Sequence, residues 1–562
     1  MKYFIPEWDD RVDPKYDFIT DTHSKEHHEN PTMNDVYTWD IFGIDKVPLD
    51  GVLVSIITMN KKKTDWALKE GIHKVLHLPQ DFEIMGDCGA FGYIKEEIPP
   101  YDPIEILDYY DKVGFNYGVS VDHLVVTGFQ EQKDNRMKLT YENGIKSFNE
   151  WKKKFRDRFQ LVVAVQGLEI KDYLKMYDDY IKHGIDHFGF GGLVRSPSTF
   201  ISELIDELID RIKKTKSVPE YLHFFGLSRS ALFPKFQELE ELGTTVGFDS
   251  ASYLRKAWLS SPEMQMNYLS LDGTGYTAIR IPTTKRRKGT NQDKESNDLE
   301  KLNQECLTKL RRYDQEKEQL ESLLSYLNQL NKTAGIRPDI LSFYKKTLLE
   351  KPWKKCDCPI CTSIGIQTVI FRGNNRNRRR GFHNTYAFYN ILKNPQLWLK
   401  LTNNKVEENK LLTLKKDQKV LIITGCTKKK LSDTPALKIQ AKKLYQGRLF
   451  KNVRRYAEKM GFDYVIISAK YGLVFPEESI GGYEQVLKTK DDVENIRPLV
   501  EKRVGPLLKQ YQKIVIIAGK HYRDVLANLW DPRFVVIRSK GYGHLASMVD
   551  KATPKEKPLG TY

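Results

Sequence analysis

Short apolar runs alternate with amphipathic segments over the first half of the chain. The runs lie at residues 52–58, at a stretch ending at 87, and at 117–122, 159–166, 187–190, 221–225 and 244–249. Between them, segments such as 169–183 and 198–214 carry apolar residues at helical spacing. Strands that alternate with helices predict a parallel sheet, either doubly wound or closed into a barrel. Both architectures place active sites at the carboxyl ends of their strands, so this pattern does not choose between them.

The pattern changes after residue 260. Residues 268–281 predict a hairpin with Asp272 and Gly273 at its turn. Leucines at helical spacing between Leu302 and Leu330 predict one long helix, and core packing or a dimer contact would explain them. Residues 403–418 are rich in lysine and glutamate and predict a linker.

Residues 419–562 predict a second, smaller, doubly wound α/β domain. Its strands would lie at 419–425, 464–468, 514–517 and 534–537, and small, polar or basic residues follow the first three. Lysines and glycines at strand ends suit a phosphate or nucleotide pocket, although a structural domain with basic loops explains them equally well. The predicted organisation is thus an N-terminal extension (1–50), a catalytic domain (51–402), the linker and this domain.

Composition limits the class of protein. A chain of 562 residues is too long for one core. No apolar run approaches the roughly 20 residues of a membrane span, and the first ten residues lack a signal-peptide pattern. Six cysteines favour a reducing cytoplasm over a disulfide scaffold. The net charge of +16 is weak support for a polyanionic partner.

A cluster of metal-ligating residue types follows the leucine-rich segment. Cys356, Cys358 and Cys361 lie within six positions, and His383 follows after 21 further residues. Three thiols and one imidazole predict a closed, structural zinc site in an insert over about residues 346–395; three unrelated reduced cysteines are the alternative. The arginines between the ligands predict contacts to nucleic-acid phosphates, with a solvated basic face as the alternative: Arg372, Arg376, Arg378, Arg379 and Arg380.

Three aspartates fall at strand ends. Asp87, Asp122 and Asp249 each close or follow an apolar run, so they can converge on one site that holds a nucleophile and a general acid or base. Gln166 adds a side-chain amide, and the glycines at 167, 191 and 192 let the backbone approach a ligand closely. Both features suit hydrogen bonding to the edge of a flat heterocycle. A capping or loop role remains the simpler reading of any single aspartate.

Taken together, these motifs resemble the tRNA-guanine transglycosylase superfamily over roughly residues 50–395. The resemblance is closest to its DNA-modifying branch, the DNA-guanine transglycosylases of 7-deazaguanine DNA modification. It implies a modified (β/α)8 barrel with a zinc-binding insert. Within the barrel it implies Asp249 as the nucleophile and Asp87 as the general base. The other residues implied to bind substrate stack on the base, read its edge, supply backbone contacts or floor the pocket: Phe91, Asp122, Gln166, Gly167, Gly191, Gly192, Leu193, Phe225 and Gly226.

The departures from the superfamily pattern concern the nucleic acid. The Pro-Thr-Arg stretch expected after the nucleophile is replaced by residues 251–257, and the Gly-Gly-Phe-Gln tail of the Asp87 motif has become Gly-Ala-Phe-Gly. The C-terminal domain resembles a family of unknown function rather than an RNA-binding module. These departures favour DNA over tRNA as the substrate. The same chemistry on tRNA is the first alternative, and a non-catalytic nucleic-acid-binding protein is the second.

The resemblance also sets expectations for partners. Duplex DNA with a flipped guanine and a free 7-deazaguanine base, such as 7-cyano-7-deazaguanine, would be the substrates, with one structural Zn²⁺ per chain. Other DNA-modification proteins and a second copy of the chain are further candidate partners, in a bacterial or phage-infected cytoplasm where the role is self-marking or restriction evasion. The basic run Lys285, Arg286, Arg287 and Lys288 joins the arginines as candidate DNA contacts.

Overall fold

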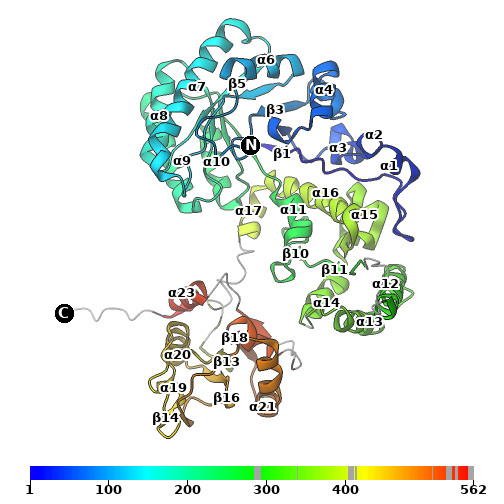
Figure 1. The fold of residues 1–562 in the computed structure, drawn as a ribbon, viewed down its shortest axis with the longest axis vertical. Helices are drawn as coiled ribbons and strands as arrows, with labels where there is room; N and C mark the ends of the chain where they lie inside the picture. The colour runs from blue at the N-terminus through cyan, green and yellow to red at the C-terminus, as the bar shows by residue number, and fades with distance from the viewer. Residues whose placement is uncertain are drawn as a thin grey trace, which may run out of the picture. The chain divides into compact units, whose positions relative to one another are not determined.

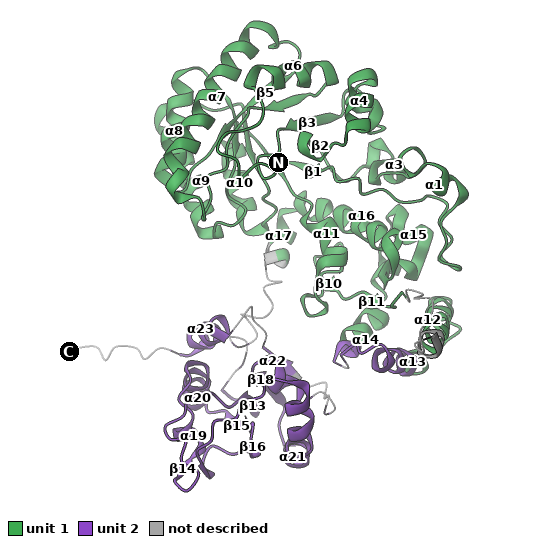
Figure 2. Ribbon diagram, in the orientation of Figure 1, with its two compact units in different colours: residues 1–323, 343–402 green, residues 324–342, 403–562 purple. Residues whose placement is uncertain are grey.

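The computed structural model divides the chain into two compact units, residues 1–323 with 343–402 and residues 324–342 with 403–562 (Figure 2). It describes residues 1–554 except 284–292, 338, 403–410, 412–413, 415, 509, 527–528, 530–533 and 538–541. The run 285–288 therefore lies outside the described residues. Among the described residues, no helix combines the length and the apolar composition that crossing a bilayer requires.

Eight parallel strands close into a barrel in the first unit (Figure 1). The order follows the sequence, and β1 pairs with β8 to close the ring. The strands are β1 (Lys2–Pro6), β2 (Gly51–Ser55), β3 (Glu83–Asp87), β4 (Tyr117–Val119), β5 (Gln160–Val165), β6 (His187–Phe190), β7 (Tyr221–Phe224) and β8 (Thr245–Asp249). The barrel that the resemblance implied is confirmed.

Helices cover the outside of the barrel and bury one apolar face each. In α9 the buried residues recur at three- and four-residue spacing from Ile201 to Ile212, as an amphipathic helix on a sheet requires. The covering helices are α4 (Lys61–Glu70), α5 (Ile72–Val75), α6 (Pro103–Val113), α7 (Lys133–Lys154), α8 (Ile170–Lys182), α9 (Ser198–Thr215) and α10 (Phe233–Glu241). The interior of the barrel holds one buried apolar cluster, which includes Phe4, Leu53, Met85, Val162 and Tyr221.

The predicted N-terminal extension is wrong at its start. Residues 2–6 were expected to precede the barrel, but they form β1, and Phe4 pairs with Gly51 on one side and Asp249 on the other. Only the apolar triplet from Tyr3 to Ile5 marks this strand, which is too short to show a periodicity. The rest of the segment holds the short helices α1 (Lys25–Glu29), α2 (Pro31–Asn34) and α3 (Thr38–Phe42).

The region after the barrel packs around a central helix, α16 (Gly373–Leu392). The predicted hairpin is present as β9 (Tyr268–Leu269) and β10 (Gly275–Tyr276), with Gly273 at a positive φ of 85° in its turn. The prediction of a single long helix is wrong. The segment forms two separate helices, α12 (Asp293–Asp314) and α13 (Leu320–Thr333), and Glu316 between them has a φ of 62°. The remaining elements are α11 (Ser252–Leu259), β11 (Ile279–Arg280), α14 (Ile340–Glu350), α15 (Pro359–Ile364), β12 (Ile370–Phe371) and α17 (Pro395–Thr402).

A five-stranded sheet forms the core of residues 416–554. Its order is β16-β15-β13-β18-β19, and all neighbours are parallel except the edge strand β16. The strands are β13 (Val420–Gly425), β15 (Asp463–Ser468), β16 (Gly472–Val474), β18 (Lys513–Ile517) and β19 (Phe534–Val536), and a small ladder joins β14 (Lys438–Gln440) to β17 (Ser479–Gly481). The helices are α19 (Ala441–Leu444), α20 (Arg448–Met460), α21 (Lys490–Leu508), α22 (Lys520–Asp524) and α23 (Tyr542–Ala552).

Candidate active site

The barrel gathers the three predicted aspartates at one end. Asp87 is the last residue of β3, Asp249 is the last residue of β8, and Asp122 follows β4 by three residues. Because all eight strands are parallel, these positions share the carboxyl end of the barrel, where the loops of such barrels carry catalytic residues. The charge of Asp122, and to a lesser degree that of Asp249, acts on Asp87.

Asp122 and Gln166 form a buried polar pair. Gln166 Nε2 donates a hydrogen bond of 2.6 Å to Asp122 Oδ2, and the two residues are only 1% and 6% exposed. Gln166 Oε1 is buried, and no described residue donates a hydrogen bond to it. A buried acceptor without a partner is costly, so it is a fitting place for a donor on a bound ligand.

The Gly191–Gly192 pair leaves room for this amide. A Cβ at Gly191 would lie 2.1 Å from Gln166 Nε2, and one at Gly192 would lie 3.0 Å from Gln166 Oε1. Gly192 also has a φ of 74°, which favours glycine. A side chain at Gly191 would displace the Gln166 amide from Asp122, and one at Gly192 would crowd its carbonyl oxygen.

Asp249 is held by donors from the neighbouring strand. Its Oδ1 accepts a hydrogen bond of 2.9 Å from the Gly226 backbone N–H and lies 3.2 Å from His223 Nε2. The Tyr221 hydroxyl lies 2.8 Å from His223 Nδ1, so it can donate there while Nε2–H donates to the carboxylate. No described residue donates to Asp249 Oδ2, which leaves one oxygen of a fixed carboxylate available.

Sequence reasoning missed His223 and Tyr221. Both lie within the apolar run 221–225, where a histidine reads as a core residue. The alternation of a β-strand was the available signal, because Tyr221, His223 and Phe225 share one face of β7. That face looks into the barrel: Tyr221 and Phe225 pack in the cluster formed by the inner faces of the strands.

The two remaining carboxyls have raised pKa values. Burial, followed by the nearby charge of Asp122, raises the pKa of Asp87 from 3.8 to about 7, although the Gly89 N–H partly offsets this. Burial raises the pKa of Asp122 to about 6, opposed by hydrogen bonds from Gln166 and Cys88. Asp87 can therefore both give and take a proton near neutral pH.

The other residues implied to bind substrate fall at neighbouring strand ends. Phe91, four residues after β3, is 57% exposed, whereas Leu193 is fully buried. Leu193 can thus offer only its backbone to a ligand. Phe225 is half-buried and packs 4.6 Å from the His223 ring. Gly167 has no room for a Cβ, which would lie 2.8 Å from the Tyr173 ring.

The cysteine–histidine cluster has the geometry of a metal site. Its four ligand atoms lie within 4.8 Å of one another, and His383 Nδ1 is 3.6, 3.4 and 3.4 Å from the sulfurs of Cys356, Cys358 and Cys361. These spacings are close to the roughly 3.3–3.8 Å separating tetrahedral ligands of one zinc ion. His383 Nε2 lies 2.8 Å from the Leu269 carbonyl oxygen, which orients the ring as metal-bound histidines usually require.

The predicted DNA contacts of the arginine cluster are wrong for four of its five members. Arg372, Arg376, Arg379 and Arg380 are at most 7% exposed. They lie on or next to α16 and bind groups within the protein: Arg372 and Arg376 pair with Asp21, Arg379 donates to the Asp13 carbonyl, and Arg380 donates to the Ala257 and Ile370 carbonyls. Burial lowers the pKa of Arg380 to about 9.

Arg378 differs from the other four, because its side chain is 33% exposed. Even so, it lies 3.5 Å from Asp10 and donates to the Arg11 carbonyl. The cluster therefore fastens the segment before β2 to α16. These guanidinium groups are already occupied, so they do not form a surface for phosphates.

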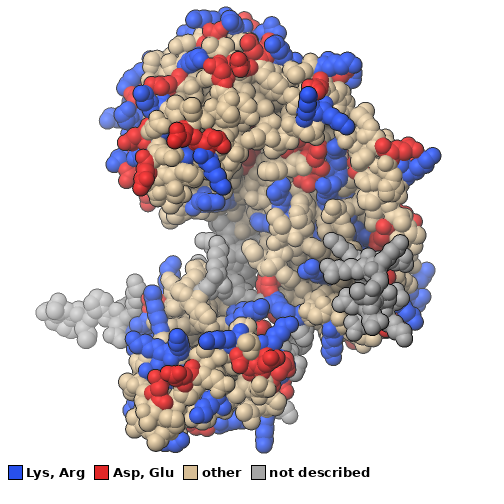
Figure 3. All heavy atoms as spheres, viewed as in Figure 1, with Lys and Arg blue, Asp and Glu red and all other residues tan. Residues whose placement is uncertain are grey.

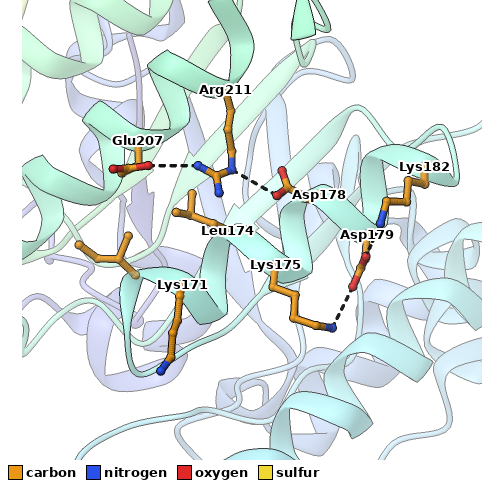
Figure 4. A pocket seen from close by; sticks show the side chains of 9 residues that line it. Lys171, Leu174, Lys175, Asp178, Asp179, Lys182, Glu207 and Arg211 are labelled. Carbon is orange, nitrogen blue, oxygen red and sulfur yellow. Dashed lines mark hydrogen bonds and ion pairs between the residues drawn. The ribbon is translucent and has the colours of Figure 1, made fainter. Parts of the chain in front are cut away.

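A cavity of about 480 Å³ lies on the outer helices α8 and α9 (Figure 4). Its charged residues pair with one another: Arg211 with Asp178 and Glu207, and Asp179 with Lys175 and Lys182. These charges neutralise one another, and the cavity contains none of the strand-end aspartates.

Two curated relatives and one family match the chain. A DNA-guanine transglycosylase of Salmonella montevideo is 29% identical over 426 residues, which cover 70% of this chain and 97% of the relative. The uncharacterized protein YfjM of Bacillus subtilis (strain 168) is 26% identical over 155 residues, 25% of this chain and 99% of the relative. Residues 420–541 match a family of unknown function (DUF6884). The predicted resemblance to DNA-guanine transglycosylases is confirmed.

Proposed function

We propose that this chain is a DNA-guanine transglycosylase that replaces guanine in DNA by a 7-deazaguanine base through a covalent bond to Asp249. One observation carries the proposal. A carboxylate fixed by Gly226 and His223, with one oxygen available, shares the barrel end with the Asp122–Gln166 pair and a second carboxyl of raised pKa. The name of the Salmonella relative supports DNA as the substrate.

The first step is attack of Asp249 Oδ2 on the anomeric carbon of a guanosine nucleotide. A bond forms between this oxygen and the anomeric carbon, and the bond from that carbon to guanine N9 breaks with its electron pair going to the base. Protonated Asp87 supplies a proton to the departing guanine. The hydrogen bonds to Oδ1 fix the carboxylate, so little reorientation is needed at the moment of attack.

The second step reverses the first with a different base. The Asp87 carboxylate takes the N9 proton of the incoming 7-deazaguanine, whose nitrogen attacks the anomeric carbon and releases Asp249. Two displacements on opposite faces give net retention, as in retaining glycosidases, with a base in place of water as acceptor. A pKa of about 7 lets Asp87 serve both steps at neutral pH.

Both bases present the same edge to the protein. The N1–H and 2-amino groups of guanine are donors that the Asp122 carboxylate and the partnerless Gln166 Oε1 can accept. A 7-deazaguanine retains these donors, so one pair of side chains can read the leaving base and the incoming base. Phe91 is exposed and free to stack on either.

The target nucleotide must leave the duplex to reach the barrel end. Flipping costs a few kcal/mol, which contacts to the DNA backbone must offset. Because the α16 arginines are occupied within the protein, these contacts come from other cations. The run Lys285, Arg286, Arg287 and Lys288 is retained as one proposed source.

The cysteine–histidine cluster fits a structural zinc. Cys356, Cys358, Cys361 and His383 would hold it in a closed tetrahedral set that leaves no open position for chemistry. All four residues are buried, and the Tyr268 ring stacks on His383 at 4.0 Å. The ion would join the segment 352–364 to α16 and, through Tyr268, to the hairpin.

Exchange of labelled guanine tests the activity and its substrate. Duplex DNA and unmodified tRNA would each be incubated with the protein and tritiated guanine, and label in the nucleic acid would be counted. We expect label in DNA with wild type and none with Asp249→Asn. Label confined to tRNA would contradict the DNA substrate, and absence of label from both would contradict the transferase.

A further inference from the structure

The sheet of residues 416–554 has a crevice at its topological switch point. The chain leaves β13 for β15 on one side and leaves β18 for β19 on the other, so the carboxyl ends of β13 and β18 diverge. In open α/β sheets, ligands bind at this place. A crevice of about 460 Å³ lies there, between the segment 425–429 after β13 and Ala518, Gly519 and Tyr522 after β18.

The crevice carries positive charge that the protein does not neutralise. Lys428, Lys429 and Arg448 line it, all three are exposed, and none has an acidic partner among the described residues. Figure 3 shows lysine and arginine side chains gathered on one part of this unit. An anion would satisfy these groups.

Backbone donors reinforce the charge. The 13-residue helix α20 begins at Arg448 beside the crevice, and no side chain caps its amino end in the described structure. Its first N–H groups lack partners within the helix and favour a bound anion. Thr427 holds this arrangement in place, because its hydroxyl accepts from Gly447 N at 3.2 Å and donates to the Lys429 carbonyl at 2.8 Å.

The crevice also has an apolar and aromatic wall. Tyr522, Tyr542 and Leu487 line it. Tyr542 lies across Gly519, where a Cβ would be 1.8 Å from the tyrosine hydroxyl oxygen. A phosphate alone would leave this wall uncovered, whereas a planar base would cover it. The volume falls within the range of small-molecule sites.

We propose that this crevice binds a nucleoside monophosphate unit, with the phosphate at Lys428, Lys429 and the start of α20 and the base against the wall that includes Tyr522 and Tyr542. The unit is either a free nucleotide or the phosphorylated end of a DNA strand. The site is separate from the barrel and does not depend on the proposed transglycosylation.

Titration calorimetry on the full chain tests the site. The probes are the four deoxynucleoside monophosphates, the corresponding nucleosides, and a short oligonucleotide with or without a 5′-phosphate. We expect at least one monophosphate to bind about tenfold or more tightly than its nucleoside, and the double variant Lys428→Ala/Lys429→Ala to lose this difference. Lys502→Ala, an exposed lysine on α21, is the matched control.

One further variant shows whether the binding signal comes from the barrel or from the crevice. Gln166→Ala removes a base-reading group of the barrel, so binding that survives it and is lost in Lys428→Ala/Lys429→Ala belongs to the crevice. Tighter binding of the 5′-phosphorylated oligonucleotide than of any monophosphate identifies a DNA end, and the reverse order identifies a free nucleotide. Absence of binding by all phosphorylated probes, or equal affinity in the double variant and Lys502→Ala, would overturn the proposal. Loss of guanine exchange with nucleotide binding intact would contradict only the barrel chemistry.

Discussion

His223 Nε2 lies 3.2 Å from Asp249 Oδ1 across the neighbouring strands β7 and β8. Both side chains are buried, and the Tyr221 hydroxyl on the far side of the imidazole fixes which nitrogen faces the carboxylate. The contact orients the proposed nucleophile without touching the reacting atoms. His223 is therefore a positioning residue.

Replacing His223 by leucine should lower kcat for guanine exchange by about 10- to 100-fold, because Asp249 loses one of its two fixed donors. KM for DNA should change much less, since His223 contacts no substrate. Tyr221→Phe should give a smaller loss in the same direction. Steady-state exchange assays check this, with the exposed His183→Ala as control. A change in KM alone would contradict a positioning role.

Asp87→Asn should raise stability at alkaline pH. The folded-state pKa of about 7 lies above the ordinary value of 3.8, so the folded protein binds this proton more tightly than the unfolded chain does. The associated stability is present below about pH 4 and is lost as pH rises to about 7. At pH 8 the variant should be more stable than wild type by about 4 kcal/mol, the free energy that corresponds to the difference between pKa values of 3.8 and about 7, and at pH 4 the difference should nearly vanish.

Denaturant unfolding at both pH values measures this difference. Asp108→Asn, on the barrel helix α6, is the matched control. Equal stability of Asp87→Asn and wild type at pH 8 would show that the carboxyl is not held in a destabilising environment.

Arg376→Met should destabilise the barrel unit by about 3–5 kcal/mol, because it leaves the largely buried Asp21 carboxylate without one of its two arginines. Arg378→Ala should cost much less, since its side chain is partly exposed. In both variants, the dependence of DNA binding on salt concentration should keep the wild-type slope. A shallower salt dependence of DNA binding for Arg376→Met would show that this arginine contacts DNA after all.

Removal of the proposed zinc should unfold the region around α16. Elemental analysis should find one zinc per wild-type chain and none in Cys358→Ser. The variant should become sensitive to proteolysis between residues 352 and 392. Full metal content in Cys358→Ser would contradict the assigned ligands.

The strand-end pattern predicted which residues share the carboxyl end of the barrel better than it predicted the surface. Asp87, Asp122, Gln166 and Asp249 mark strand ends directly in the sequence, so a parallel sheet brings them to one edge whatever its closure. The partners of the arginines could not be read in the same way. Asp21 lies 351 residues before Arg372 and has no local signature, so a buried ion pair resembled a basic patch.

The closure of the barrel was the other feature that the sequence pattern alone could not predict. Pairing of β1 with β8 joins residues 2–4 to residues 247–249, a contact that no local pattern specifies. The barrel came from the family resemblance, since the alternation of strands and helices left a doubly wound sheet open. His223 was hidden for a related reason: whether a strand residue faces the barrel interior is decided by register, which the sequence alone does not show.

Covalent trapping at Asp249 tests the proposed mechanism most directly. The protein would be mixed with guanine-containing duplex DNA without an acceptor base, denatured and digested, and its peptides examined by mass spectrometry. We predict a nucleotide adduct on the peptide containing Asp249 in wild type and none in Asp249→Asn. Guanine exchange by wild type without any adduct at Asp249, or an equal adduct in Asp249→Asn, would contradict the covalent mechanism.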